Sequence, residues 1–168
     1  MSDGQISLPL VVRTANGAGS KFGAQHSQSL ENWSMAVPGL KVVAPSNPKD
    51  VIGLMTAAVA DPDPVIFYEH KSLYPVKEEI SDTNFSIPLG KANILHNGSD
   101  ACIISLGLMA QRSVEAAKAL KEKHDISITV IDLRCLVPLD LQLIKREVKK
   151  SGIIFTVEEN PRLCGWGA

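Results

Sequence analysis

Strand-like and helix-like segments alternate along almost the whole of this 168-residue chain, and this alternation is the strongest constraint on its fold. Short apolar runs, typical of buried strands, are followed by segments with apolar residues every three or four positions, typical of helices. Such spacing favours parallel strands joined by right-handed helical crossovers. The sequence therefore predicts an α/β fold with two parallel-sheet units.

A change of composition divides the two units. Residues 76–90 are charged and then polar, with Pro75 and Pro88 beside or within them, and this segment is predicted to be a linker between residues 1–75 and 91–168. Strands are expected at 8–12, 40–44, 65–68, 90–95, 101–106, 126–133 and 153–157, with the first of them buried. Helices are expected near 27–35, 47–60, 110–123 and 140–151.

Four positions predict where helices begin and end. Asn47 and Asp140 are suited to the N-cap, because their side chains accept a hydrogen bond from an amide of the first turn. Pro48 suits the first helical position. Gly152 suits the position just beyond a helix, where the backbone turns left-handed.

Charge and hydropathy exclude several classes of protein. The net charge of −1 gives no basic field for nucleic acid. No apolar run approaches the roughly 20 residues needed to span a bilayer, and residues 1–5 do not resemble a secretory signal. The scattered cysteines, Cys102, Cys135 and Cys164, indicate neither zinc nor a disulfide framework. We therefore expect reduced thiols and a cytoplasmic location, or the mitochondrial matrix if the parent is eukaryotic.

The segment Gln25-His26-Ser27-Gln28 is the main candidate for chemistry. It follows a predicted strand and the glycine-rich loop Asn16-Gly17-Ala18-Gly19, so it falls where α/β proteins usually place functional loops. Histidine changes its protonation most easily near neutral pH. From these residues alone, a loop histidine that only bonds to backbone is an equal alternative. A serine hydrolase is disfavoured, because the chain has no Gly-x-Ser-x-Gly elbow.

Four segments taken together resemble the beta subunit of the thiamine-diphosphate-dependent first component of 2-oxo acid dehydrogenase complexes. Pyruvate, branched-chain and acetoin dehydrogenases share this subunit. The segments are residues 10–14 with 23–29, 38–46, 63–74, and 130–140 with 157–160. The resemblance implies that residues 1–75 are the C-terminal half of a pyrimidine-binding domain and that 91–168 form a transketolase C-terminal-like domain, truncated at its end. It also implies an internal fragment, and we expect the isolated fragment to be inactive.

The resemblance implies roles for four residues. His26 matches the family's active-site histidine, which assists acyl transfer to a lipoyl group. Ala58, Asp61 and Asp63 match positions that hold a potassium ion through backbone carbonyls. From the residues alone, the two aspartates indicate either a divalent-metal pair or, more simply, a turn between prolines. From the residues alone, Glu69 is expected to be a paired structural carboxylate rather than a general base. Asp132 and Arg134, with Asp140, are expected to have a salt-bridged or interface role rather than a catalytic one, and Arg134 could face a partner.

The implied function is decarboxylation of a 2-oxo acid on thiamine diphosphate, an oxidoreductase activity, followed by transfer of the acyl group to lipoyl. The implied partners are an alpha subunit that holds most of the cofactor and its magnesium, a second beta subunit, and a lipoyl-bearing acyltransferase. Three alternatives stay open: an acetoin dehydrogenase beta subunit, a noncatalytic assembly module of a transketolase-type enzyme, and a piece of a transketolase or deoxyxylulose-phosphate synthase. The Gln25–Gln28 tetrad favours the dehydrogenase over the last of these.

Overall fold

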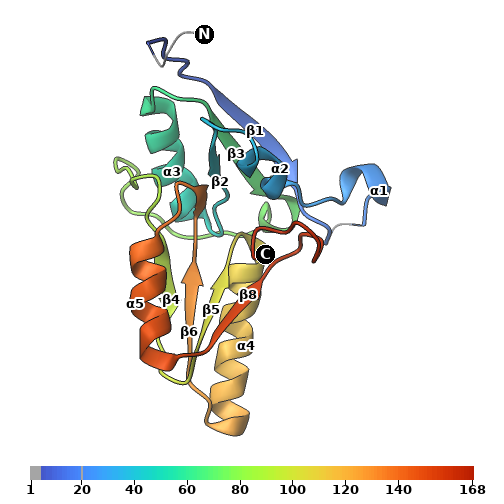
Figure 1. Cartoon of the computed structure of the whole chain (residues 1–168), viewed down its shortest axis with the longest axis vertical. Coiled ribbons are helices and arrows are strands. Elements are labelled where there is room, and N and C mark those ends of the chain that lie inside the picture. The colour runs from blue at the N-terminus through green and yellow to red at the C-terminus, as the bar shows by residue number, and fades with distance from the viewer. Residues whose placement is uncertain (1–4, 20) are drawn as a thin grey trace.

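The computed structural model describes residues 5–19 and 21–168, which form two four-stranded sheets (Figure 1). The first sheet has the order β1–β3–β2–β7 and the second has the order β4–β6–β5–β8. The strands are β1 (Val11–Asn16), β2 (Lys41–Val43), β3 (Val65–His70), β4 (Asn93–His96), β5 (Ala101–Ser105), β6 (Ile128–Asp132), β7 (Cys135–Val137) and β8 (Ile154–Val157). The helices are α1 (Gly23–His26), α2 (Glu31–Met35), α3 (Pro48–Ala60), the 3-10 turn η1 (Lys71–Leu73), α4 (Leu108–His124) and α5 (Leu141–Ser151). Residues 1–4 of the predicted first unit and Ser20 of its glycine-rich loop lie outside the described residues.

The predicted α/β class is confirmed, although neither sheet is wholly parallel. In the first sheet, β3 is parallel to both β1 and β2, and in the second, β5 is parallel to both β6 and β8. One edge strand of each sheet, β7 or β4, runs antiparallel to its neighbour. The sequence did not predict β7 at all, because its three residues are too few to show a periodicity.

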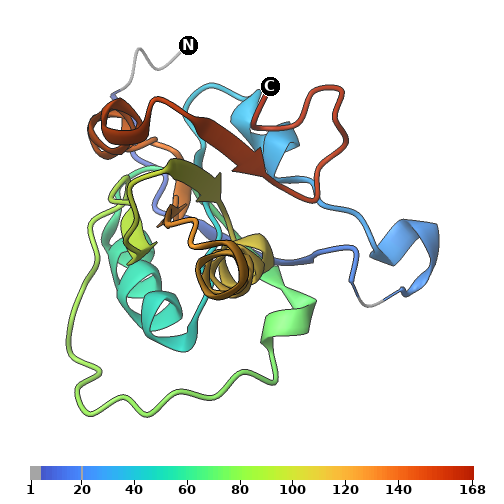
Figure 2. The same ribbon diagram turned by 90° about the horizontal axis from the view of Figure 1, so that it is seen from below.

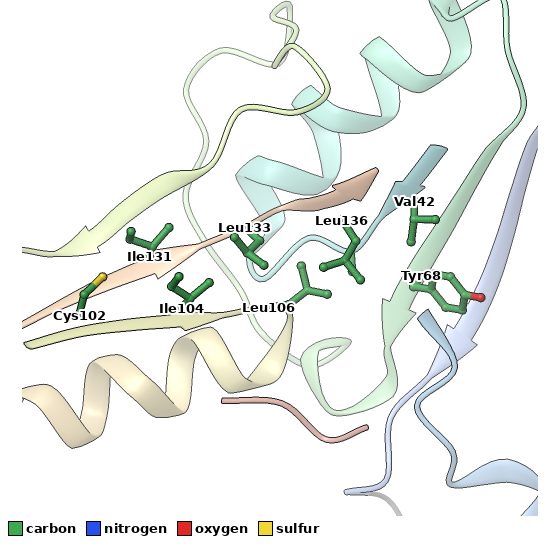
Figure 3. Close-up of a cluster of buried hydrophobic side chains, with 9 residues drawn as sticks. Val42, Tyr68, Cys102, Ile104, Leu106, Ile131, Leu133 and Leu136 are labelled. Atoms are coloured by element: carbon green, nitrogen blue, oxygen red, sulfur yellow. The ribbon is translucent and has the colours of Figure 1, made fainter. Parts of the chain in front are cut away.

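Strand β7 ties the two halves of the chain together. It follows the predicted linker in sequence, yet it pairs with β2 and so completes the first sheet (Figure 1). One apolar core also crosses from sheet to sheet (Figure 3). It joins Val42 and Tyr68 of the first sheet to Ile104 and Ile131 of the second. The two sheets therefore share buried surface.

The central strands of the second sheet are covered on both faces. Every residue of β5 and β6 is buried. Cys102 and Ile104 of β5 belong to the core that Ile144 of α5 covers, whereas Ile103 belongs to a core that Val114 of α4 covers. This alternation is the one expected of a strand between two helical layers.

Strand β1 corrects the prediction of a buried strand at residues 8–12. The strand spans Val11–Asn16, and Leu8, Leu10 and Val12 are 57%, 48% and 42% exposed. The physical reason is that β1 is an edge strand, paired within the described residues only with β3. An apolar run indicates a strand but does not reveal how many neighbours will cover it.

The predicted linker is an extended strap that lies against α3 (Figure 2). The amide of Ile87 donates to the carbonyl of Gly53 over 2.9 Å, and the Glu78 carboxylate accepts from the amide of Lys49. A Cβ on Gly53 would lie 2.6 Å from the side chains of Ile87 and Phe85. Glycine at this position therefore allows the strap to approach the helix closely.

The helix ends follow the sequence signals, with one exception. The side chains of Asn47 and Asp140 accept from the amides of Asp50 and Leu143, over 2.8 and 3.1 Å. Gly152 adopts φ 70° at the end of α5. Of the single helix expected at 27–35, only Glu31–Met35 is helical, as α2, and the short helix α1 at Gly23–His26 was not predicted. Across the described part of the chain, no helix has the length and hydropathy needed to cross a membrane.

Candidate functional site

The candidate site lies where β1 and β3 end side by side. Asn16, the last residue of β1, is the register partner of His70, the last residue of β3. The chain then leads through the glycine-rich loop into α1, which projects away from the body of the protein (Figure 1). His26 is the last residue of α1 and is exposed. The structure thus places the predicted histidine at the carboxyl edge of parallel strands.

His26 lines an open hollow of about 540 Å³. The hollow combines apolar and aromatic surface with side chains that donate and accept hydrogen bonds. Its walls also include Asn16, Phe22, Gln25, Gln28, Leu30, Tyr68 and Lys71. The Tyr68 hydroxyl donates to the carbonyl of Leu30 over 3.1 Å and lies 2.7 Å from the Ser34 hydroxyl. Tyr68 therefore serves the structure, while the imidazole of His26 faces open space.

Few contacts hold α1 in place. Gln28 donates to the carbonyl of Ala24 over 2.9 Å, and the ammonium group of Lys71 donates to the carbonyl of His26. The Lys71 nitrogen also lies 6.0 Å from the centre of the Phe22 ring. Among the four residues of α1, all of them described, none is buried. The position of His26 therefore depends strongly on Lys71.

His70 lies beneath this loop and connects the two halves of the chain. Its Nε2 atom lies 2.6 Å from a carboxylate oxygen of Glu159, a residue that follows β8. Its Nδ1 atom accepts from the amide of Ser72 over 3.1 Å. A Cβ on Gly17 would lie 2.2 Å from the His70 ring, and Gly17 has φ 104°. The first glycine of the loop is therefore required by both backbone conformation and contact with His70.

Asn160 forms a second connection between the halves. Its Nδ2 atom donates to the carbonyl of Ser29 over 2.7 Å and to the Glu31 carboxylate over 3.1 Å. Burial raises the pKa of Glu31, and the nearby Glu159 carboxylate raises that pKa further, although the hydrogen bond from Asn160 lowers it. Asn160 thus bonds to residues that follow His26, while Glu159 bonds to His70, whose ring lies beside Gly17 of the loop that precedes His26.

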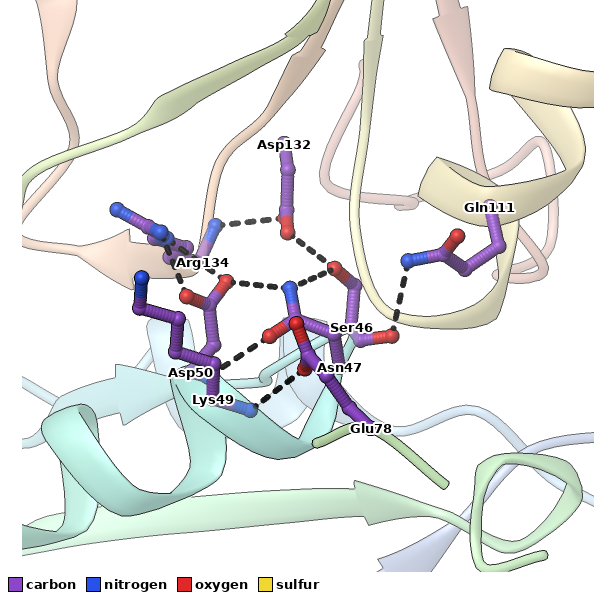
Figure 4. Close-up of polar contacts among 8 residues, drawn as sticks. All are labelled: Ser46, Asn47, Lys49, Asp50, Glu78, Gln111, Asp132 and Arg134. Atoms are coloured by element: carbon purple, nitrogen blue, oxygen red, sulfur yellow. Dashed lines mark hydrogen bonds and ion pairs between the residues drawn. The ribbon is translucent and has the colours of Figure 1, made fainter. Parts of the chain in front are cut away.

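A buried polar network lies between α3 and the end of β6 (Figure 4). Arg134 donates two hydrogen bonds to Asp50, of 2.8 and 2.6 Å. Asp132 accepts from the Ser46 hydroxyl over 2.5 Å and from the Arg134 amide over 3.0 Å. Burial raises the pKa of Asp132 to about 7, despite those hydrogen bonds. Asp132 and Arg134 are thus held in structural contacts, as the sequence led us to expect, and Glu69 pairs with Arg13 over 2.7 Å.

The candidate potassium residues lie together at the end of α3. The carbonyl of Ala58 accepts from the amide of Asp61 over 3.3 Å. The ammonium group of Lys41 contacts the carboxylates of both Asp61 and Asp63, over 2.5 and 3.2 Å. Lys41 therefore offsets part of the negative charge of these side chains. Burial alone would raise the pKa of Asp61, but the hydrogen bond from Lys41 is among the causes that lower it below its usual value. A site built from backbone carbonyls stays a prediction.

The described residues fit one side of a thiamine cofactor. The hollow offers an exposed imidazole, carboxamides and aromatic surface to a ring. Within residues 5–19 and 21–168, no group of three or more His, Cys, Asp or Glu side chains is placed to hold a metal ion.

Sequence reasoning missed His70, Lys71 and Glu159 as parts of this site. His70 is the last residue of β3, Lys71 follows that strand and Glu159 follows β8, so the carboxyl-edge rule applies to all three. The pairing of His70 with Glu159 joins residues 89 positions apart. No local pattern reports such a contact.

The two halves of the chain match two family models. Residues 1–77 match the pyrimidine-binding domain of transketolase and residues 90–168 match the transketolase C-terminal domain. The chain is 43% identical over 164 residues to the beta subunit of an acetoin:2,6-dichlorophenolindophenol oxidoreductase from Cupriavidus necator, covering 98% of this chain and 48% of that protein. It is 45% identical to the mitochondrial pyruvate dehydrogenase E1 component subunit beta-1 of Arabidopsis thaliana, covering 95% of this chain and 45% of that protein.

A solved structure described as a split gene transketolase, an inactive beta4 tetramer, is 24% identical with a TM-score of 0.79. The match covers 99% of this chain and 54% of that structure's chain, and it shows that the two share a fold. The chain spans about half the length of the curated relatives it matches. The chain thus carries a pyrimidine-binding domain and a C-terminal domain of the transketolase type, and it is 42–45% identical to pyruvate dehydrogenase and acetoin dehydrogenase beta subunits over nearly its whole length.

Proposed function

We propose that this chain is part of the beta subunit of a thiamine-diphosphate-dependent 2-oxo acid dehydrogenase, which decarboxylates its substrate and passes the acyl group to a lipoyl group. The observation that carries the proposal is the exposed imidazole of His26 beside the hollow at the carboxyl edge of β1 and β3. Identity to pyruvate dehydrogenase beta subunits over nearly the whole chain supports the reaction class. Identity to acetoin dehydrogenase beta subunits keeps acetoin as a second candidate substrate.

In this proposal the residues of the chain bind, orient and move protons. Thiamine diphosphate, when bound, supplies the carbon chemistry of decarboxylation. An imidazole nitrogen of His26 holds or delivers a proton during acyl transfer, a contribution typically worth roughly 10²- to 10⁴-fold in rate. Phe22 and Leu30 provide apolar surface in the walls of the same hollow.

The remaining parts of the site are assigned to partners. We propose an alpha subunit as the carrier of magnesium and of the diphosphate group, and a second beta subunit and a lipoyl-bearing acyltransferase as further partners. This division is consistent with the described residues, in which no group of three or more His, Cys, Asp or Glu side chains is placed to hold a metal ion. Potassium at Ala58, Asp61 and Asp63 is part of the same proposal.

The test combines assembly with the chemistry of His26. A tagged chain is expected to co-purify with an alpha subunit, and the complex is expected to reduce a lipoyl acceptor in the presence of pyruvate or acetoin. Replacing His26 with Gln should lower acyl transfer by about 10²-fold or more, while decarboxylation measured with a dye acceptor falls much less. Equal rates of acyl transfer in the two proteins would contradict the role of His26.

Purification of the chain without an alpha subunit, and without activity in the reconstituted mixture, would favour the alternative of a noncatalytic assembly module. The chain by itself, with added thiamine diphosphate, is expected to show no turnover. Decarboxylation by the chain alone at rates well above the blank would refute that expectation.

A further inference from the structure

We infer that Glu159 and His70 are positioning residues for His26, and that they act through Ser72 and Lys71. The inference rests on the proposed role of His26 in acyl transfer. It assigns to the C-terminal domain, which supplies Glu159, a direct influence on the loop that carries the imidazole.

The tautomer of His70 follows from its two contacts. The amide of Ser72 is a donor, so the Nδ1 atom that it contacts over 3.1 Å must be the acceptor and carries no hydrogen. The ring proton is therefore on Nε2, which donates to the Glu159 carboxylate over 2.6 Å. A hydrogen bond to an ionised group is among the stronger kinds in proteins.

The position of the His70 ring is fixed on several sides. The side chains of His70 and Glu159 are only 6% and 18% exposed. The ring occupies the space beside Gly17 in which a Cβ would have to lie. Because the ring is buried against Gly17 and bonded to Glu159, its Nδ1 atom is held as an acceptor for the amide of Ser72.

That acceptor orders the short turn η1. The side chain of His70 is the N-cap of η1, and the turn carries Lys71. The ammonium group of Lys71 then donates to the backbone carbonyl of His26. His70 and Glu159, which connect the two domains, thus influence the exposed helix α1 through the turn η1.

The hydrogen bond from Lys71 can determine the position of helix α1, because little else holds this helix. Of its four residues none is buried, and its N-cap, Phe22, makes no side-chain hydrogen bond to it. A segment with little buried surface opens at low free-energy cost. A misplacement of about 1 Å at a reacting group can reduce a rate by about 10²-fold. Loss of the Lys71 contact is therefore expected to affect the chemistry of His26 more than the stability of the fold.

The first test measures tautomer and order on the full 168-residue chain by ¹⁵N NMR, so it does not depend on activity. We expect the Nε2-protonated tautomer of His70. Backbone order parameters of residues 23–26 should fall from about 0.85 to below about 0.6 in Lys71→Met and in Glu159→Ala. The control Glu158→Ala alters the neighbouring carboxylate, which accepts from the amides of Trp166 and Gly167 and not from His70. It should leave residues 23–26 ordered.

The second test measures rates in the complex with the alpha subunit. Lys71→Met should lower acyl transfer to lipoyl about tenfold and dye-linked decarboxylation less than about twofold, and Lys71→Arg should restore most of the loss. An Nδ1-protonated His70, or unchanged order of residues 23–26 in both Lys71→Met and Glu159→Ala, would overturn the inference. Loss of order in these variants together with full activity of His26→Gln would instead refute the proposed function and leave the positioning contacts intact.

Discussion

The network of Ser46, Asp50, Asp132 and Arg134, which we call the seam, and the segment α1 differ in almost every physical respect. Asp50 and Asp132 of the seam are 1% and 0% exposed, and each makes hydrogen bonds to Arg134. In α1 the side chains are exposed, and one ammonium group and one carboxamide hold the turn. The dense buried contacts of this chain thus lie between its sheets, whereas the candidate catalytic histidine lies on an exposed short helix held by few contacts.

The largest effect is expected when the seam loses its cation. Arg134→Ala leaves the buried carboxylate of Asp50 without its bidentate partner, and breaking a buried ion pair in this way typically costs about 3–5 kcal/mol. Urea unfolding of the chain measures the change. The control is Arg112→Ala, because Arg112 and its partner Glu115 are 63% and 65% exposed and their pair should contribute little. Equal midpoints for the two variants would contradict the importance of the seam.

A smaller effect is expected at the contact between loop and His70. Gly17→Ala combines a positive φ with a Cβ 2.2 Å from the His70 ring, whereas Gly39→Ala has φ 90° and nothing within 4 Å of its Cβ. Backbone strain alone costs of order 1–3 kcal/mol. The free energy of unfolding should therefore fall in both variants, and clearly further in Gly17→Ala. Equal losses would show that the ring moves aside without cost.

The pH dependence of stability should report the buried carboxyl group of the seam. Because the pKa of Asp132 is raised to about 7 in the folded protein, the folded state keeps a proton that the unfolded chain releases near pH 4. The folded state binds more protons between these values, so the contribution of Asp132 to stability falls as the pH rises from about 4 to about 7.

Asp132→Asn is the matched test of that titration. Asparagine is neutral at every pH and keeps an acceptor for the amide of Arg134, so the variant should lose less stability than the parent between pH 5 and pH 7. Thermal unfolding at several pH values gives the two slopes. A parent that is stabilised relative to the variant as the pH rises would contradict the sign.

The smallest change in stability is expected in α1. His26→Ala removes an exposed side chain, so the free energy of unfolding should change by less than about 0.5 kcal/mol. Circular dichroism during urea unfolding is sufficient to measure this. A large loss would mean that α1 is part of the rigid structure and would remove the contrast with the seam.

The elements that could be predicted from the sequence are those with local signals. Apolar periodicity located the strands near β2, β3, β5 and β6, and Asn47 and Asp140 located helix starts. The sequence could not reveal that β7 joins the first sheet, because its pairing with β2 is decided by tertiary contacts. For the same reason the exposure of β1 was mispredicted.

The candidate site divides in the same way. His26 lies in the Gln25–Gln28 motif and could be predicted as a candidate site residue from the sequence. His70 and Glu159 come into contact only when both sheets have formed. Ala58, Asp61 and Asp63 were grouped by sequence, but the ammonium group of Lys41 that contacts the two carboxylates comes from β2. Residue spacing predicts which residues lie close together within one helix or strand. It does not predict which helices and strands will pack against each other.

The central claim is that His26 is exposed in the chain and faces the bound cofactor in the assembled enzyme. Modification of histidines by diethylpyrocarbonate, followed by mass spectrometry, tests it directly, with exposed His124 as the internal control and buried His70 as the slow reference. We expect His26 and His124 to react readily in the chain, and thiamine diphosphate to slow only His26, by about tenfold or more, in the complex with the alpha subunit. Equal rates at His26 with and without thiamine diphosphate would contradict the account.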